Sequence, residues 1–373
     1  MTIVRVGLLG CGDIGLRHAQ AYGHLVSRQN AAVRLVAVHD VDPVRAHAVA
    51  GRYCRMTGST VKIVDRAERL FSSSDIDAID IALPTYLHRE AATAALGRGK
   101  SVLVAKPLGL TLEDCDAILD AAASPQMIAV AENFRHAPGS KAIAHALGSG
   151  AIGYPIHMDL SISIPSKELS RNAPPWLADT GKAGDYLALE LGVHEMDLQL
   201  AWLGPMALIS ASRSGTKNYD SGGHLAASIS FAGGSSSVTR FNLRTEWTGD
   251  WQVRRFIRGP QGSITSRSWC GWHDGVLATP KRRLLSQAYI EGNISSIFRD
   301  REERECILEA RSFGQAASND PVGYGIVSCI WDFVVSISKG KRPLVSGVEG
   351  RAAVAASHAI LAAAQSGKAM TPQ

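Results

Sequence analysis

Short apolar runs alternate with amphipathic stretches through the first third of the chain. The apolar runs span residues 3–9, 33–38, 61–64, 77–83, 101–105 and 127–131. The stretches with helical periodicity span residues 14–29, 42–56, 85–99 and 111–124. Strands that are apolar on both faces and separated by helices predict a parallel sheet with helices on both sides. We therefore expect a doubly wound α/β domain at the start of the chain.

From about residue 151 the pattern changes to longer strands in which apolar and polar positions alternate. These strands are predicted within 155–164, 207–215, 224–244 and 250–269, with AGGSSS at 232–237 as a hairpin loop. An antiparallel sheet can leave one face free. The second part of the chain is therefore expected to form a separate domain around such a sheet.

The first predicted strand runs into a GxGxxG sequence that opens a helix. Its glycines allow a tight turn, a close approach of the backbone to a pyrophosphate, and close packing of the helix on the strand. With 36 glycines in the chain the pattern alone is weak, but the strand before it and the helix after it are the context that a dinucleotide site requires. The predicted cofactor-binding residues in this loop are Gly10, Cys11, Gly12, Asp13, Ile14 and Gly15.

Asp40 ends the second predicted strand. A carboxylate at this position accepts hydrogen bonds from both ribose hydroxyls of the adenosine half and repels a 2′-phosphate, so Asp40 favours NAD over NADP. Two alternatives stay open. Asp40 can instead cap the turn HDVDP, and Arg45 is near enough in the sequence to accommodate NADP.

Polar residues also follow the fourth and sixth predicted strands. In LPTYLHRE, Thr85 is expected to cap a helix and to leave His88 in its first turn, near the cofactor. The cofactor-binding residues assigned here are Pro84, Thr85 and His88, together with Asn133 in AENFRH. The alternative for His88 is a surface position without a role, and we assign it no catalysis.

Lys106 follows the apolar strand SVLVA and precedes a proline. Lysine is rarely buried, so its amine either reaches water where the strand stops or points into a site. In a doubly wound sheet the ligand lies outside the carboxyl ends of the strands. Lys106 is expected at that edge.

A helix predicted over residues 184–204 has two polar stripes. At about 100° per residue, Glu190 and His194 lie on one stripe, and Glu195 and Gln199 lie on nearly the opposite side. We expect the Glu195 and Gln199 stripe to face solvent, because it contains no histidine, and the other stripe to line a cleft. Imidazole titrates near neutral pH and a carboxylate one turn away can hold it, which suits acid–base chemistry.

Two alternatives for the cleft-lining stripe stay open. His194 can be a buried histidine bonded to Glu190. Asp197 lies on the same stripe and would complete a metal site, but no further His or Cys stands at ligand spacing nearby, and we predict no metal.

The loop PSKELSRNAPPWLADTGKAG precedes this helix and has no clear periodicity. Trp176 is a candidate substrate contact, because an indole can stack on the apolar face of a sugar ring. The loop also carries Lys167, Arg171, Asp179 and Lys182. The alternative is a solvated connector with one packed tryptophan.

Composition narrows the class of protein. The chain has 373 residues, 46% of them apolar and 20% charged, which is typical of a soluble globular enzyme of about two domains. The net charge of +5 is spread along the chain, which disfavours nucleic acid as a partner. The six cysteines form no CxxC pair, no export signal opens the sequence, and no apolar run approaches the ~18 residues of a membrane span. We therefore predict a cytoplasmic protein without membrane contact.

As an ordered set, these motifs resemble the Gfo/Idh/MocA family, which includes glucose-fructose oxidoreductase and inositol dehydrogenase. The matching stretches are the GxGxxG loop, ALPTYLHREAATAALGRGKSVLVAKPLG, AENFRHAPGSKAIAHALGSGAIGYPI, KAGDYLALELGVHEMDLQLAWLG and GKRPLVSGVEGRAAVAASHAILAAAQSGK. The resemblance implies an NAD(P)-binding Rossmann domain over residues 1–133. Over residues 134–373 it implies an α+β domain with a large open, mostly antiparallel sheet for substrate binding and oligomerisation, and assembly as a homodimer or homotetramer.

The resemblance also implies roles for individual residues. The lysine of the family's EKP sequence is Lys106, which would contact the nicotinamide ribose and the substrate hydroxyl. The family's catalytic histidine is His194, with Glu190 as the carboxylate one turn earlier. Two departures are visible: Ala105 stands where the family has Glu, and Glu190 replaces the Asp of inositol dehydrogenase.

Together these residues predict NAD-dependent oxidation of a secondary hydroxyl of a sugar, cyclitol or related polyol, with NADP left open. His194 would remove the hydroxyl proton, Lys106 would stabilise the developing charge on the oxygen, and Glu190 would orient His194 or bind a neighbouring hydroxyl. The predicted substrate contacts are Lys106, Trp176, Glu190 and His194. Two alternatives are a reductase of a dihydrodiol, imine or keto acid, and a non-catalytic dinucleotide sensor that would not need Lys106.

Overall fold

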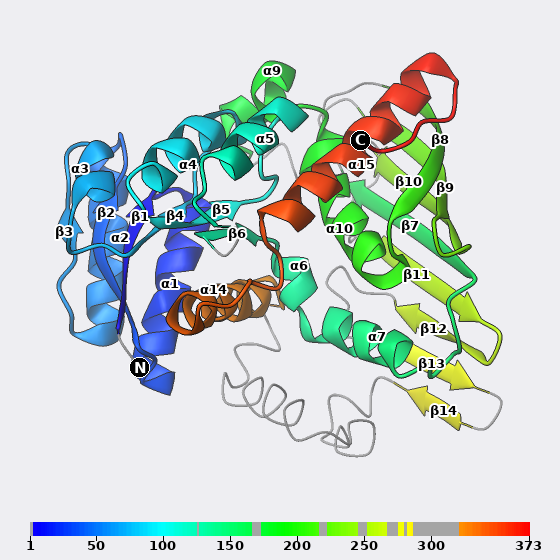
Figure 1. Cartoon of the computed structure of the whole chain (residues 1–373), viewed down its shortest axis with the longest axis horizontal. Coiled ribbons are helices and arrows are strands. Elements are labelled where there is room, and N and C mark those ends of the chain that lie inside the picture. The colour runs from blue at the N-terminus through cyan, green and yellow to red at the C-terminus, as the bar shows by residue number, and fades with distance from the viewer. Residues whose placement is uncertain are drawn as a thin grey trace. The chain divides into compact units, whose positions relative to one another are not determined.

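A computed structural model of the chain describes residues 3–124, 127–165, 173–215, 222–244, 252–266, 275–279, 282–285 and 321–373 (Figure 1). The chain divides into two compact units. The first unit contains Met1–Asn133 and Val322–Val354, and the second contains Phe134–Pro321 and Ala355–Gln373.

The sheet of the first unit has six parallel strands in the order β3-β2-β1-β4-β5-β6. The strands are β1 (Val4–Leu9), β2 (Val33–His39), β3 (Lys62–Ile63), β4 (Ala78–Ile81), β5 (Ser101–Ala105) and β6 (Ile128–Ala131). The central strand β4 is buried at every position, as expected where helices cover both faces. The strand order reverses between β1 and β4, and in such sheets a ligand binds at this point, outside the carboxyl ends of the strands. The predicted Rossmann fold is confirmed.

Helices connect these strands, and capping side chains explain where two of them begin. The helices are α1 (Asp13–Gln29), α2 (Pro43–Thr57), α3 (Glu68–Ser72), α4 (His88–Leu96) and α5 (Leu112–Asp120). Before α2, Val44 N donates to the Asp42 carboxylate, and Thr111 and Asp114 form a capping box at α5. A 3₁₀ turn, η1 (Thr85–Leu87), precedes α4. The expected helix cap at Thr85 is therefore wrong, because the chain makes this tighter turn before α4 begins.

A segment from late in the chain completes the first unit. It contains α14 (Pro321–Lys339) and the start of α15 (Gly347–Ser366). Val130 N donates to Val345 O at 2.9 Å, and Ala129 forms an antiparallel bridge with Ser346, so the segment covers the outer edge of β6. The sequence alone assigns residues 322–354 to the second domain, whereas their contacts group them with the first unit. A covering segment protects the unpaired backbone groups of an edge strand. The apolar pattern of a helix does not specify which sheet the helix will cover, so the sequence pattern does not predict this placement.

The sheet of the second unit has eight strands in the order β14-β13-β12-β11-β7-β10-β9-β8. The strands are β7 (His157–Pro165), β8 (Met206–Gly215), β9 (Gly223–Phe231), β10 (Ser236–Arg244), β11 (Gln252–Gly259), β12 (Gly262–Ser266), β13 (Gly275–Thr279) and β14 (Arg282–Leu285). Strands β7 and β10 pair in parallel, and the other pairs are antiparallel. The predicted mostly antiparallel sheet and the β9–β10 hairpin are confirmed.

One face of this sheet is covered and the other is open. In β7, Met158, Leu160 and Ile162 are fully buried, whereas Asp159 and Ser161 between them are partly exposed. Helix α10 (Gly192–Leu203) lies against the covered face (Figure 1). The other helical segments before it are α6 (Asn133–His136), α7 (Pro138–Gly148), η3 (Pro175–Ala178), α9 (Thr180–Ala183) and the π-helical η4 (Tyr186–Leu191). Of the helices in the described ranges, none has the length and apolarity needed to cross a bilayer.

Candidate active site

The glycine-rich loop between β1 and α1 has the geometry of a phosphate-binding turn. Gly10 has φ +95°, and a Cβ on it would lie 2.4 Å from Ala82 O. A Cβ on Gly15 would lie 2.0 Å from Gly10 O, so this glycine lets α1 approach the turn. In contrast, a Cβ on Gly12 would meet no atom within 4 Å. Gly12 borders open space at the start of a 17-residue helix, where backbone N–H groups bind phosphate. This loop fits a dinucleotide.

Asp40 is half-buried at the end of β2 and links two backbone segments. Cys11 N donates to Asp40 Oδ2 at 2.6 Å, and Asp42 N donates to Asp40 Oδ1 at 2.8 Å. Asp40 therefore caps its own turn and also ties it to the glycine loop. Each carboxylate oxygen can accept a further hydrogen bond, so capping does not exclude binding of ribose hydroxyls. Arg45 contacts Asp42, with Nε 3.4 Å from Oδ2.

The side chain of Cys11, inside the glycine loop, is an uncharged group. Burial, and then the charge of Asp40, raise the pKa of the Cys11 thiol to about 12. The thiol is therefore protonated at neutral pH. The negative charge at this end of the sheet comes from Asp40 rather than from a thiolate.

His88 is fully buried at the start of α4. Its Nδ1 lies 2.9 Å from Pro107 O, and its Nε2 lies 2.8 Å from Leu83 O. The alternative of a surface position is therefore wrong, because the ring contacts the backbone of two loops. Any contribution of His88 to a cofactor site comes through the loops it contacts. Thr85, two residues after Leu83, is also buried.

Lys106 is half-buried directly after β5, and its peptide bond to Pro107 is cis. β5 lies next to β4, which in turn lies next to β1. The carboxyl ends of parallel strands meet at one edge of the sheet. Lys106, Asp40 and the glycine loop therefore follow the same edge of the first unit. Asn133, also assigned to the cofactor, follows β6 and is 9% exposed.

In the second unit, Glu190 and His194 lie on different helical segments. Glu190 belongs to η4, whose wider π-helical turns interrupt the periodicity assumed from the sequence, and His194 belongs to the first turn of α10. Each is 7% exposed. The His194 ring stacks on Phe134, with centroids 4.1 Å apart and planes 13° from parallel. Asp185 caps the start of η4 by accepting from Ala188 N at 3.0 Å.

Asp197, which shares the stripe of Glu190 and His194, is part of a buried ion pair. Its two carboxylate oxygens accept from Arg135, with distances of 2.8 Å to Nε and 3.1 Å to Nη2. Across the described residues, no group of three or more His, Cys, Asp or Glu side chains is placed to hold a metal ion.

The expectation that Glu195 and Gln199 face solvent is wrong. Both are 0% exposed. Arg255 of β11 donates to both carboxylate oxygens of Glu195, with Nε 3.0 Å from Oε2. Gln199 donates to Thr239 Oγ1 at 2.9 Å and accepts from Ser237 Oγ at 2.6 Å, both on β10. The covered face of the sheet provides polar partners for Glu195 and Gln199, so this stripe of the helix packs against the sheet.

Trp176 is half-buried in η3. Nearby, Asp179 and Lys182 form an exposed ion pair at 3.5 Å. Lys167 and Arg171 of the same loop lie outside the described residues. The role of Trp176 as a substrate contact stays a prediction.

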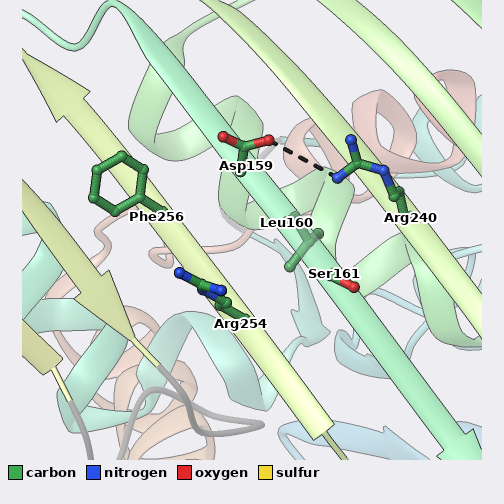
Figure 2. A pocket seen from close by; sticks show the side chains of 6 residues that line it. All are labelled: Asp159, Leu160, Ser161, Arg240, Arg254 and Phe256. Atoms are coloured by element: carbon green, nitrogen blue, oxygen red, sulfur yellow. Dashed lines mark ion pairs between the residues drawn. The ribbon is translucent and has the colours of Figure 1, made fainter.

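The open face of the second sheet has a shallow hollow of about 290 Å³. Figure 2 shows Asp159 and Arg240 directed toward each other from β7 and β10, with Arg254 and Phe256 on β11. The residues that line the hollow are Asp159, Leu160, Ser161, Arg240, Arg254 and Phe256. None of the predicted site residues is among them.

Comparison with known proteins identifies the first unit. Residues 4–134 match the oxidoreductase family with an NAD-binding Rossmann fold. Inositol 2-dehydrogenase of Acidothermus cellulolyticus is 33% identical over 202 residues, which are 54% of this chain and 53% of that protein. Inositol 2-dehydrogenase of Rhizobium meliloti is 29% identical over 275 residues, 71% of this chain and 76% of that protein. The chain thus spans about half the length of the first relative.

The fold of the whole chain has a solved counterpart. A structure of levoglucosan dehydrogenase in complex with NADH superposes with a TM-score of 0.79 at 20% identity, covering 100% of both chains. At this identity the likeness establishes the fold alone.

Proposed function

We propose that this chain, whose residues 4–134 match the Gfo/Idh/MocA oxidoreductase family, is a member of that family and a dehydrogenase of a sugar, cyclitol or related polyol. The observation that carries the proposal is the single sheet edge that combines Gly12, Asp40 and Lys106: a phosphate turn open to a ligand, a carboxylate for ribose, and a cation directly after β5. The names of the two inositol dehydrogenase relatives support a polyol substrate.

In the proposed reaction the residues of the chain handle the proton and the charge. The chemistry that a bound NAD would supply is acceptance of the hydride from the carbon that bears the hydroxyl. His194 accepts the hydroxyl proton, and Lys106 donates a hydrogen bond to the same oxygen as negative charge develops on it. Acid–base assistance of this kind contributes about 10² to 10⁴ in rate, and correct positioning contributes more.

Three further roles belong to the same proposal. Glu190 orients His194 or binds a neighbouring hydroxyl, and its side chain is one methylene longer than the Asp of inositol dehydrogenase. Trp176 stacks on the apolar face of the substrate. Asp40 selects NAD over NADP, because its carboxylate repels a 2′-phosphate.

The proposed activity is tested by absorbance at 340 nm with a panel of inositols, sugars and keto acids, each with NAD and with NADP. We expect oxidation of at least one polyol and a preference for NAD of at least about tenfold, since a tenfold ratio needs only ~1.4 kcal/mol. A preference for NADP contradicts the role of Asp40. Activity on keto acids alone points to the alternative reductase.

Lys106→Ala tests the proposed chemistry directly. Loss of the hydrogen bond to the reacting oxygen is expected to lower kcat by at least about 10²-fold, with NADH affinity by fluorescence changed less than about threefold. Lys368→Ala, at an exposed position near the C-terminus, is the control and should behave as the unmodified protein. Unchanged turnover in Lys106→Ala contradicts a catalytic lysine. A protein that binds NADH but turns over no substrate in any form is the alternative sensor.

Assembly and location are the remaining parts of the proposal. The open sheet face, with Arg240, Arg254 and Phe256 around its hollow, supports a homodimer or homotetramer, since arginine and aromatic residues are enriched at interfaces. Cys11, Cys54 and Cys115 form no disulfide within the described residues, which supports a reducing compartment such as the cytoplasm.

A further inference from the structure

We infer that His88 is a positioning residue that sets the place of Lys106 and, separately, of the cofactor loop at Pro84 and Thr85. This inference rests on the proposed dehydrogenase function. His88 itself is fully buried. It acts through the backbone on either side of its ring.

The ring of His88 joins the carboxyl ends of two neighbouring strands. Strands β4 and β5 pair in parallel, with Ile81 opposite Val104. Leu83 follows β4, Pro107 follows β5, and the His88 nitrogens lie 2.8 Å and 2.9 Å from their carbonyl oxygens. These two segments lead directly to the residues assigned to the cofactor and to Lys106. One side chain therefore fixes the spacing of two parts of the candidate site.

The chemistry of imidazole makes the two contacts separable. Carbonyl oxygens only accept hydrogen bonds, so each contact requires that the ring nitrogen carry a proton. A neutral ring donates to one of the two carbonyls, and a protonated ring donates to both. Nδ1 contacts Pro107 O, next to Lys106, and Nε2 contacts Leu83 O, next to the residues assigned to the cofactor.

The chain after Lys106 is enclosed from the other side as well. Leu108 is fully buried. A Cβ on Gly350 of α15 would lie 3.2 Å from Leu108 Cβ, and a Cβ on Gly109 would lie 2.8 Å from Asp114 Cβ. The backbone at residues 107–109 thus lies between α4, α5 and α15, with the His88 ring as its polar contact to α4.

The position of the Lys106 backbone matters because the lysine side chain is long and flexible. Four rotatable methylenes place the ammonium only as well as the Cα is placed. Ala105, the preceding residue, has no polar side-chain atom that could hold the amine. An error of about 1 Å at a reacting group can lower the rate about 10²-fold, so loss of the Pro107 contact should appear in kcat.

Two amide substitutions separate the two contacts. The side-chain amide of Asn reaches the position of Nδ1, and that of Gln reaches the position of Nε2. We expect His88→Gln to lower kcat about 10²-fold with KM for NAD changed less than about threefold. We expect His88→Asn to raise KM for NAD at least about fivefold with kcat nearly unchanged. Equal losses in both variants, or the reverse split, would overturn the inference.

His47→Gln is the matched control, because His47 Nδ1 also contacts a proline carbonyl, Pro43 O at 2.7 Å, but on the exposed surface of α2. It should leave both constants unchanged. His88→Phe keeps a flat ring without nitrogens and is expected to lose kcat and NAD affinity together. If His88→Phe has the kcat and the NAD affinity of the unmodified protein, the ring contributes only by filling space and the inference is wrong.

Hydrogen–deuterium exchange gives a readout that does not need activity. In His88→Gln and His88→Phe, the peptide covering residues 101–112 should exchange faster, while peptides of α1 stay unchanged. Exchange that rises equally throughout the first unit indicates a merely structural role and overturns the inference. If the unmodified protein oxidises no polyol, the proposed function fails, and the exchange measurement still decides the role of His88.

Discussion

At the scale of single residues, two glycines of the glycine loop have different roles: one is required for packing of the fold, and the other is proposed to be required for cofactor binding. Gly15 is required by the fold, since a Cβ there would overlap the Gly10 carbonyl at 2.0 Å. Gly12 is not, because a Cβ there would have open space around it and its φ of −70° is accessible to any residue. Substitution of these two glycines is therefore expected to have different effects on stability and on NADH binding.

Gly15→Ala and Gly12→Ala test this separation. We expect Gly15→Ala to lower the free energy of unfolding by about 1–3 kcal/mol, as in other overpacked sites. We expect Gly12→Ala to change it by less than about 0.5 kcal/mol, but to weaken NADH binding by at least about tenfold, because the methyl group occupies the place of the pyrophosphate. Urea unfolding and NADH fluorescence titration provide the two values. Unimpaired NADH binding by Gly12→Ala would remove the loop from the cofactor site.

Residues whose role depends on the neighbouring sequence can be predicted from the sequence alone. The glycine loop, Asp40 and Lys106 are identified from the strand before each of them and from the motif they belong to. The burial of His88 is not accessible in this way, because its two partners are carbonyl oxygens that every residue has. Likewise, the contact of Asp40 with Cys11 N joins the ends of different strands and leaves no trace in the sequence.

At the scale of elements, α10 shows how a correct periodicity can lead to a wrong assignment. The two polar stripes exist, but both are buried in the second unit. The partner of Glu195 is Arg255, which stands 60 residues later in the chain. In the strand pattern of β11, Arg255 occupies an inward position among apolar neighbours, with Val253 and Ile257 buried on either side. An arginine at an inward strand position is the signal that could have identified the buried stripe.

The ion pair of Glu195 with Arg255 should dominate the stability of the second unit. Glu195→Gln removes the carboxylate that pairs with Arg255, a cation at 1% exposure, and we expect it to lower the free energy of unfolding by about 3–5 kcal/mol. Asp65→Asn, which breaks an exposed pair with Arg69, should change it by less than about 0.5 kcal/mol.

The double variant Glu195→Leu with Arg255→Met provides the internal check. Removing both charges leaves no buried cation that has lost this carboxylate, so this variant should be more stable than Glu195→Leu alone. Chemical unfolding of the four variants gives the comparison. If the double variant is the less stable one, the pair does not act as a buried, mutually compensating unit.

At the scale of the whole molecule, the two sheets have the types that their patterns predict. Continuous apolar runs give the parallel sheet and alternating runs give the mostly antiparallel one, because burial on one or two faces is visible in each strand separately. The assignment of residues 322–354 to the first unit cannot be predicted from such strand patterns. It depends on long-range contacts between an apolar helix and an edge strand, and many apolar helices would satisfy that pattern.

The open face of the second sheet leads to a prediction for assembly. Light scattering at micromolar concentration should give two or four times the 39.7 kDa of one chain. Arg254→Glu reverses a charge at the hollow and places it near Asp159, so it should shift the mass toward that of one chain. Lys368→Glu, at an exposed position near the C-terminus, should leave the mass unchanged. A mass near 40 kDa for the unmodified protein would contradict the proposed oligomer.

The late segment that covers β6 has a consequence for biosynthesis. Cys329, whose thiol contacts Val130 O, lies 199 residues after it, and Val345 and Ser346 follow later still. A ribosome therefore releases the whole nucleotide-binding sheet long before it releases the residues that close that sheet's outer edge. During translation the nascent chain carries an unprotected strand edge, the kind of surface on which chains pair wrongly with one another. The unit that is translated first is therefore completed only after most of the second unit has been translated.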